Sequence, residues 1–129
     1  MGKRIIGNTK KTKELKSKNM ERLNILWTSK DKDTFMHMVA LYAGNSIKNS
    51  WWDEVNIIIW GGSTRLSGED KEVQNELQKL IKNGVTVEAC KACADKMKLT
   101  TTLNDLGITV KYMSKLTGLI KGKEHLITI

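Results

Sequence analysis

The sequence contains no proline, only two cysteines and no long apolar run. Without proline a thioredoxin-like site is disfavoured, because such sites place a cis-proline opposite their cysteine pair. The longest apolar run, around residues 57–60, is far too short to cross a bilayer, so no membrane partner is expected. No apolar stretch with a small-residue cleavage site follows the basic N-terminus, which argues against a secretory signal. We therefore expect a cytoplasmic protein whose thiols are reduced.

Sequence signatures of nucleotide, metal and hydrolase sites are missing as well. Gly61 and Gly62 allow a tight turn, but neither a GxGxxG nor a GxxxxGK[ST] pattern is present. His37 and His125 have no metal-site spacing to the cysteines, so neither a metal nor another cofactor is expected. His37 is interpreted as a core or interface residue. No Ser-His-Asp set occurs at a recognisable spacing.

The positive charge is concentrated at the N-terminus. The chain has a net charge of +8, and residues 1–22 carry eight basic and two acidic side chains. Their share is +6, which leaves only +2 for residues 23–129. Residues 1–22 are therefore expected to form a basic, flexible tail beside a single α/β domain of residues 23–129. The alternative is an arm that contacts RNA or tRNA, although base stacking is not expected because the tail has no aromatic residue.

Beyond residue 22, short apolar runs alternate with helical periods. The run 55–60 is β-branched and nearly uninterrupted, which is typical of a strand covered on both faces. A capping box is predicted with Ser67 as N-cap and Asp70 reaching back, ahead of a helix whose apolar stripe includes Leu77. The predicted strands are residues 23–27, 55–60, 85–88, 108–110 and 125–129.

Three joints share one pattern: a helix end, a glycine that can adopt a left-handed conformation, and a β-rich run. The glycines are Gly84, Gly107 and Gly122. Repeated helix-to-strand joints with intervening helices predict βαβ units and a mostly parallel five-stranded sheet. The pattern does not reveal the strand order.

The chemistry is expected beyond the carboxyl ends of these strands, where ligands collect in open parallel sheets. Cys90 lies where the third strand ends and a helix begins. Free amide N–H groups at a helix start stabilise a thiolate, so we expect Cys90 to be exposed, with a pKa lowered toward neutrality and Lys91 and Lys96 adding positive charge nearby. The pocket around it is predicted from the ends of the first two strands: Thr28, Ser29, Trp60, Gly61, Gly62 and Ser63.

An inert packing role stays open for both thiols, since cysteine is often simply buried. Cys93 lies one turn into the helix, where its side chain can face the core. The two thiols are also close enough along a helix start to form a disulfide. Trp51 and Trp52, which precede the second strand, are interpreted as packing residues or a subunit contact.

Five segments carry a resemblance to a known family: 57–61, the following loop to Leu66, the helix end at 83–84, 85–93 and 106–108. Together they resemble the DsrE/DsrF-like proteins over residues 23–129. The resemblance implies a single-domain, three-layer α/β/α fold of flavodoxin-like layering and assembly into trimers or hexamers. It also implies that Cys90 matches the position at which some members carry a persulfide. Gly62 departs from the pattern, because many relatives have proline there.

The leading hypothesis is a sulfur carrier. Cys90 would accept sulfane sulfur from a persulfide donor protein and pass it to an acceptor protein, and Cys93 could resolve the persulfide by releasing sulfide. Whether such a carrier counts as a sulfurtransferase enzyme stays open. The alternative is an oligomeric module that binds a small ligand or a protein and whose thiols are not catalytic.

Overall fold

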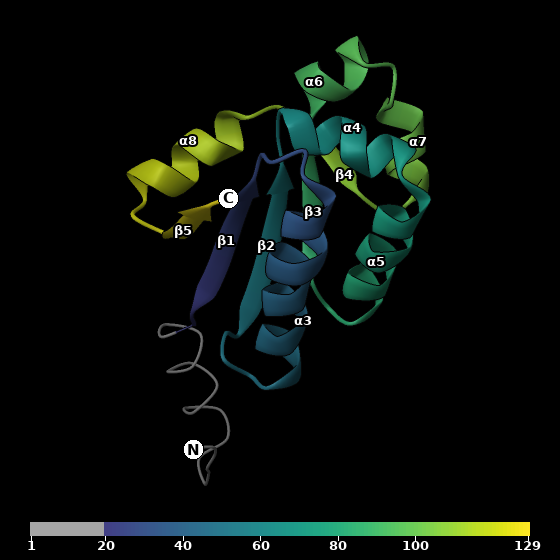
Figure 1. Cartoon of the computed structure of the whole chain (residues 1–129). Coiled ribbons are helices and arrows are strands. Elements are labelled where there is room, and N and C mark those ends of the chain that lie inside the picture. The colour runs from purple at the N-terminus through teal and green to yellow at the C-terminus, as the bar shows by residue number, and fades with distance from the viewer. Residues whose placement is uncertain (1–19) are drawn as a thin grey trace, which may run out of the picture.

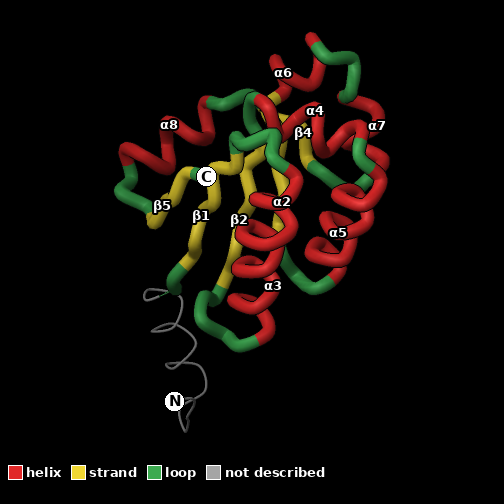
Figure 2. Tube along the Cα trace, in the orientation of Figure 1, coloured by secondary structure: helices red, strands yellow, loops and turns green. Residues whose placement is uncertain are grey.

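The computed structural model describes residues 20–129, so most of the expected tail, residues 1–19, lies outside the described residues. Strands and helices alternate along the chain, as predicted (Figures 1 and 2). Within the described part, no helix is both long and apolar enough to span a membrane. The elements are β1 (Arg22–Trp27), α2 (Lys32–Thr34), the π-helix η1 (Phe35–Val39), α3 (Ala40–Lys48), β2 (Glu54–Ile59), α4 (Gly62–Glu69), α5 (Lys71–Lys82), β3 (Thr86–Cys90), α6 (Lys91–Lys96), α7 (Thr100–Asp105), β4 (Thr109–Lys111), α8 (Ser114–Lys121) and β5 (His125–Thr128).

The five strands form one parallel sheet in the order β4-β3-β2-β1-β5. The predicted sheet is therefore confirmed. Each of the first four strands lies beside its predecessor, whereas β5 crosses to the far side of β1. Because crossovers between parallel strands are right-handed, this reversal places α8 on the opposite face of the sheet from α3 and α5 (Figure 1). Helices on both faces give the three-layer arrangement.

The two faces bury different amounts of apolar surface. On the face covered by α3, α5, α6 and α7, twenty residues form one core, with Ile57 and Leu77 fully buried. On the other face only four residues form a cluster: Leu26, Ile58, Leu116 and Leu119. Because successive side chains of a strand point to opposite faces, β1 and β2 contribute residues to both the large core and the small one.

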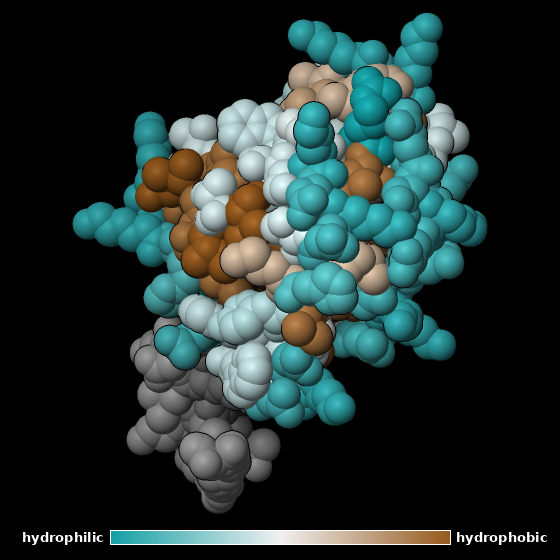
Figure 3. All heavy atoms as spheres, in the orientation of Figure 1, coloured by the Kyte–Doolittle hydropathy of each residue, from teal (hydrophilic) through white to brown (hydrophobic). Residues whose placement is uncertain are grey.

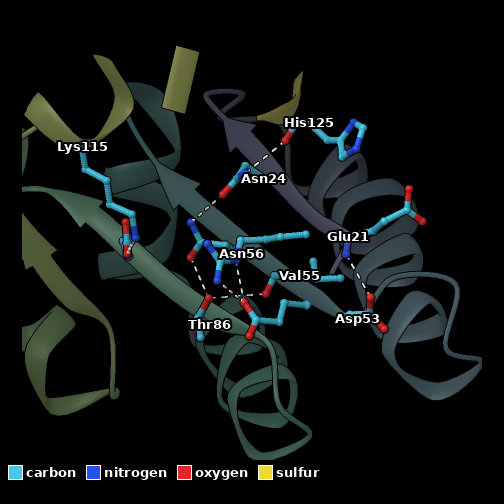
Figure 4. Close-up of polar contacts among 11 residues, drawn as sticks. Glu21, Asn24, Asp53, Val55, Asn56, Thr86, Lys115 and His125 are labelled. Carbon is cyan, nitrogen blue, oxygen red and sulfur yellow. Dashed lines mark hydrogen bonds and ion pairs between the residues drawn. The ribbon is translucent and has the colours of Figure 1, made fainter. Parts of the chain in front are cut away.

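The polar side chains of three strands fill the face beside the small cluster. Asn24 donates to the carbonyl of His125 at 3.1 Å, Asn56 donates to the Asn24 side chain at 3.2 Å, and Thr86 donates to the Asn56 side chain at 2.7 Å. Both asparagines are buried, at 0% and 3% exposure. The result is a polar row that links β5, β1, β2 and β3 (Figure 4).

One predicted helix start is wrong. Ser67 lies inside α4 and its hydroxyl donates to the carbonyl of Ser63 at 2.7 Å, while Asp70 caps α5 by accepting from the amide of Val73 at 3.0 Å. The reason is that Gly61, at φ +69°, lets a separate helix begin directly after β2. The extended backbone of Asp70 then separates α4 from α5.

The helix-to-strand joints follow the predicted pattern at two of three positions. Gly84 and Gly107 have φ of +106° and +92°. At the third joint Gly122 has φ of −79°, and Lys123 adopts the left-handed conformation instead, with φ of +56°. Gly122 is still constrained, because an added Cβ would lie 3.1 Å from the carbonyl oxygen of Gly118.

Candidate functional site

The structure joins the loops after β1 and β2 at the carboxyl edge of the sheet. The carbonyl of Trp27 accepts from the Trp60 amide at 3.2 Å and from the Ser63 hydroxyl at 2.5 Å. The Trp60 amide also lies 3.1 Å from the Ser63 oxygen. Ser63 is fully buried, so its hydroxyl holds the two loops together and does not face a ligand.

The two predicted pocket residues after β1 have hydrogen-bond partners within the chain. The amides of Thr28 and Ser29 donate to the backbone oxygen of Ile129 at 2.6 and 3.3 Å, and the Thr28 hydroxyl lies 3.2 Å from the same oxygen. The amide of Ile129 in turn donates to the Leu26 carbonyl at 2.8 Å. The residue after β5 thus occupies the donor groups of these two predicted pocket residues.

A groove of about 520 Å³ lies beside the second loop. Of the six predicted pocket residues only Gly62 lines it; Trp60 is 39% exposed, and Gly61 shapes the turn. An added Cβ at Gly62 would lie 3.1 Å from the Thr28 carbonyl oxygen, so the close approach of the two loops requires glycine. The other residues lining the groove are Lys30, Arg65, Leu66, Glu69, Asp70 and Met97.

Cys90 is the last residue of β3 and the N-cap of α6. Its Sγ accepts the amide N–H of Cys93 at 3.5 Å. The register pairs Ile59 with Ala89, so Trp60 and Cys90 leave neighbouring strands at the same level. Among residues 20–129, however, no hydrogen bond links Cys90 to the loops after β1 and β2.

The expectation of an exposed, acidified Cys90 is wrong for this chain. Only 4% of the residue is exposed. Burial raises the pKa of the Cys90 thiol above its ordinary value, and this effect outweighs the amides of Cys93 and Ala92, which lower it. The thiol of Cys93 adds to the upward shift of the pKa by a hydrogen bond.

The cationic charge predicted beside Cys90 is partly neutralised. Lys91 forms an ion pair with Asp95 at 2.6 Å and lies 5.7 Å from the ring centre of Tyr112. Lys96 is exposed at the end of α6, where no ion pair forms with any described residue. Cys93 is half-buried and therefore more accessible than Cys90.

Sequence reasoning missed Glu88, which lies two residues before Cys90 on β3. Its side chain is only 9% exposed and is paired with Lys115 of α8, which Figure 4 labels. It is also paired, at 3.9 Å, with Lys111 of β4. Since alternate residues of a strand share a face, Glu88 and Cys90 both point toward the α8 side of the sheet. The available signal was a carboxylate within the β-rich run 85–90.

Comparison with known proteins identifies the relatives of this chain. The model of the DsrE/DsrF-like family matches residues 12–129, so the match begins within the expected tail. A conserved Bacteroides thetaiotaomicron protein of unknown function, BT1422, is 41% identical, with a TM-score of 0.83 over 84% of this chain and 95% of that one. The comparison with the curated proteins found no match.

Two more distant solved structures share the fold. MTH1491 from Methanobacterium thermoautotrophicum, a protein of unknown function, is 13% identical with a TM-score of 0.70, over 84% of this chain and 99% of that one. The ychN protein of E. coli is 16% identical with a TM-score of 0.63, over 85% of this chain and 99% of that one. At these identities the likeness concerns the fold alone.

Proposed function

The chain belongs to the DsrE/DsrF-like family, and we propose that it is a sulfur carrier that holds a persulfide on Cys90. The observation that supports this is the Cys90 Sγ at the carboxyl end of β3, which accepts the amide N–H of Cys93, so that a second cysteine lies one turn away on α6. A sulfur carrier needs a thiol that can exchange and a means of protecting the sulfur it holds. Burial of Cys90 supplies the protection.

The loading reaction needs no oxidant. A thiolate of the chain attacks the terminal sulfur of a donor persulfide; the donor's S–S bond breaks, its thiolate leaves, and a new S–S bond forms on this protein. Delivery to an acceptor thiol reverses these steps. A reducing compartment such as the cytoplasm would keep both thiols ready for this exchange.

Mass spectrometry of the intact protein tests the proposal. After incubation with glutathione persulfide and removal of the donor, the protein should retain one added sulfur atom, mapped to Cys90. Cys90→Ser should retain none after exposure to excess glutathione, and the double variant Cys90→Ser/Cys93→Ser serves as the blank. If Cys90→Ser retains sulfur as stably as the wild type, Cys90 is not the carrier residue.

One observation favours the rival function of a binding module: the low exposure and raised pKa of Cys90 fit a thiol with no catalytic role. The groove lined by Leu66 and Met97 would then be the place for a ligand. In that case neither thiol should acquire sulfur from glutathione persulfide in the folded protein, although both should react with iodoacetamide in denaturant. Sulfur uptake in the folded state would exclude this alternative.

We also infer that the chain assembles with further copies of itself. Large apolar side chains are exposed on η1, α3, the loop before β2 and the edge strand β5: Met38 at 53%, Tyr42 at 40%, Trp51 at 53% and Ile127 at 41%. The ring of Trp52, in the same loop as Trp51, lies 5.2 Å from that of His125 on β5. Figure 3 shows an apolar patch on this side of the molecule. Tyr42 and Trp51 lie 5.7 Å apart, and β5 itself contains neither a charged residue nor proline to block edge pairing. The opposite edge strand, β4, carries Lys111.

Light scattering after gel filtration measures this assembly. The wild type should elute as an oligomer, and Ile127→Lys should shift it toward the monomer by charging the free edge. Tyr112→Lys is the matched control, because Tyr112 is also exposed, at 64%, but lies between β4 and α8. A monomeric wild type, or equal effects of both variants, would contradict this interface.

A further inference from the structure

We propose that Cys93 is the thiol through which sulfur enters, and that Cys90 receives it from Cys93 and stores it. This inference rests on the proposed sulfur carriage and changes the role expected for Cys93, which was to release sulfide. The structure supplies the difference between the two thiols: Cys90 is 4% exposed, whereas Cys93 is half-buried.

Access favours Cys93 as the first acceptor. Thiol exchange requires the attacking sulfur to reach the outer sulfur of the donor persulfide, so the donor must approach closely. A residue that is 4% exposed does not admit a donor without local opening. Cys93 is half-buried and so needs less opening than Cys90, and α6 lies at the outer end of the sheet (Figure 1).

The local geometry favours transfer between the two thiols. Cys90 is the N-cap of α6 and Cys93 is its third residue, so the helix start holds both in one turn. The Cys93 amide contacts the Cys90 Sγ at 3.5 Å, which keeps the backbone of Cys93 beside the Cys90 sulfur. Transfer over this contact is intramolecular, which gives it the advantage of a high effective concentration.

Atoms and protons balance in both steps. In the first step the Cys93 thiolate attacks the outer sulfur of the donor persulfide, the donor's S–S bond breaks and its thiolate leaves; Cys93 now carries –S–SH. In the second step the Cys90 sulfur attacks the outer sulfur of Cys93–S–SH. The S–S bond between the Cys93 Sγ and the outer sulfur breaks, and the Cys90 proton passes to Cys93. The products are Cys90–S–SH and Cys93–SH, and no oxidant or reductant is needed.

Burial explains why the sulfur should rest on the inner thiol. Small thiols in solution remove the outer sulfur of any persulfide that they can reach. On Cys93 the persulfide would be open to this loss. On Cys90 the same low exposure that prevents direct loading also shields the product. The two cysteines therefore have separate roles, entry and storage.

Timed quenching followed by peptide mapping tests the order of transfer, with glutathione persulfide as donor. In the wild type, sulfur should appear first on Cys93 and then on Cys90. Cys93→Ser should slow loading of Cys90 by about tenfold, because access then needs local opening. Cys90→Ser should load Cys93 at the wild-type rate but lose the sulfur rapidly to added glutathione.

Controls separate this inference from the proposed function. Thr101→Ser, on an exposed position of α7, should behave as the wild type. Cys93→Ala tests whether any slowing depends on the introduced hydroxyl, and thermal unfolding checks that the variants are folded. If Cys93→Ser and Cys93→Ala load Cys90 at the wild-type rate, Cys93 is not the entry thiol although sulfur carriage stands. If the wild type takes up no sulfur on either thiol, the carrier function itself fails.

Discussion

The two faces of the sheet differ in what covers them. One face is covered by the helices from η1 to α7 and has a core of twenty buried apolar residues, whereas the other carries α8 and a cluster of four. The second face has fewer buried apolar residues and instead has polar contacts: the row from Asn24 to Thr86 and the Glu88–Lys115 ion pair. A β-strand buried on both sides therefore does not imply two apolar cores.

The two faces also contribute differently to the stability of the fold and to the specificity of strand pairing. Apolar burial on the larger face supplies most of the free energy of folding, since it scales with the area removed from water. The polar row restricts which strands can pair, because a shift of one residue would leave buried amides without partners. Cys90, the candidate thiol, lies two residues after Glu88 on β3. The buried carboxylate of Glu88 is paired with Lys115 on the polar face.

The largest expected effect is on the larger face. Leu77→Ala should lower the free energy of unfolding by about 3 kcal/mol, because Leu77 is fully buried and the surrounding residues cannot close the cavity. Leu119→Ala, on the smaller face and 8% exposed, should cost about half as much, since α8 can move to fill the space. Urea denaturation measures both; equal losses would contradict the division into a large and a small core.

The polar row should give the next largest effect. Asn56→Leu removes a donor to Asn24 and an acceptor from Thr86, and should cost about 2 kcal/mol even though leucine is more apolar. Thr109→Val on the exposed part of β4 is the control and should change stability little. If Asn56→Leu unfolds at the same urea concentration as the wild type or higher, the row does not stabilise the sheet.

The ion pair of Glu88 should contribute less. Glu88→Gln should cost about 1 kcal/mol, because Lys115 is 39% exposed and stays hydrated when its partner is neutralised. A double-mutant cycle with Lys115→Met isolates the coupling between the two side chains, and added salt should reduce it. A cycle with no coupling at low salt would show that α8 is held by its apolar contacts alone.

The smallest effect concerns the pH dependence of stability. Burial raises the pKa of Cys90 in the folded chain, so the folded state binds this proton more tightly than the unfolded state. The stabilisation is therefore complete below the unfolded thiol pKa of about 8.5 and is lost as the pH rises from there through the folded pKa. Cys90→Ala should flatten this alkaline decline in urea titrations across that range. An unchanged slope would show that Cys90 is not the group responsible.

Much of the architecture could be predicted from the order of residues. Apolar periodicity located the five strands within a residue or two, and the glycines before β3 and β4 marked the joints. The same pattern placed Cys90 at the end of a strand and the start of a helix, as the structure has it. These features depend on neighbours within a few residues, which is why local pattern was enough.

The helix start after β2 and the contacts of the loop after β1 were harder to predict. Ser67 looked like a helix cap because its neighbours have the residue types of a capping box, but the Gly61 turn started a helix earlier and gave the cap to Asp70. The predicted pocket residues Thr28 and Ser29 do follow β1. Their occupation by the backbone of Ile129 depends on a contact between residues 101 positions apart in the sequence.

Local residue order thus fixed which segments are strands and where the thiol lies along the chain. The strand order, the burial of Cys90 and the contacts of Glu88 were settled only when distant segments packed together. The physical reason is that a thiol's pKa depends on how much water surrounds it, and that quantity belongs to the packed chain as a whole. A helix start suggested an acidic thiol; the folded protein made it a shielded one.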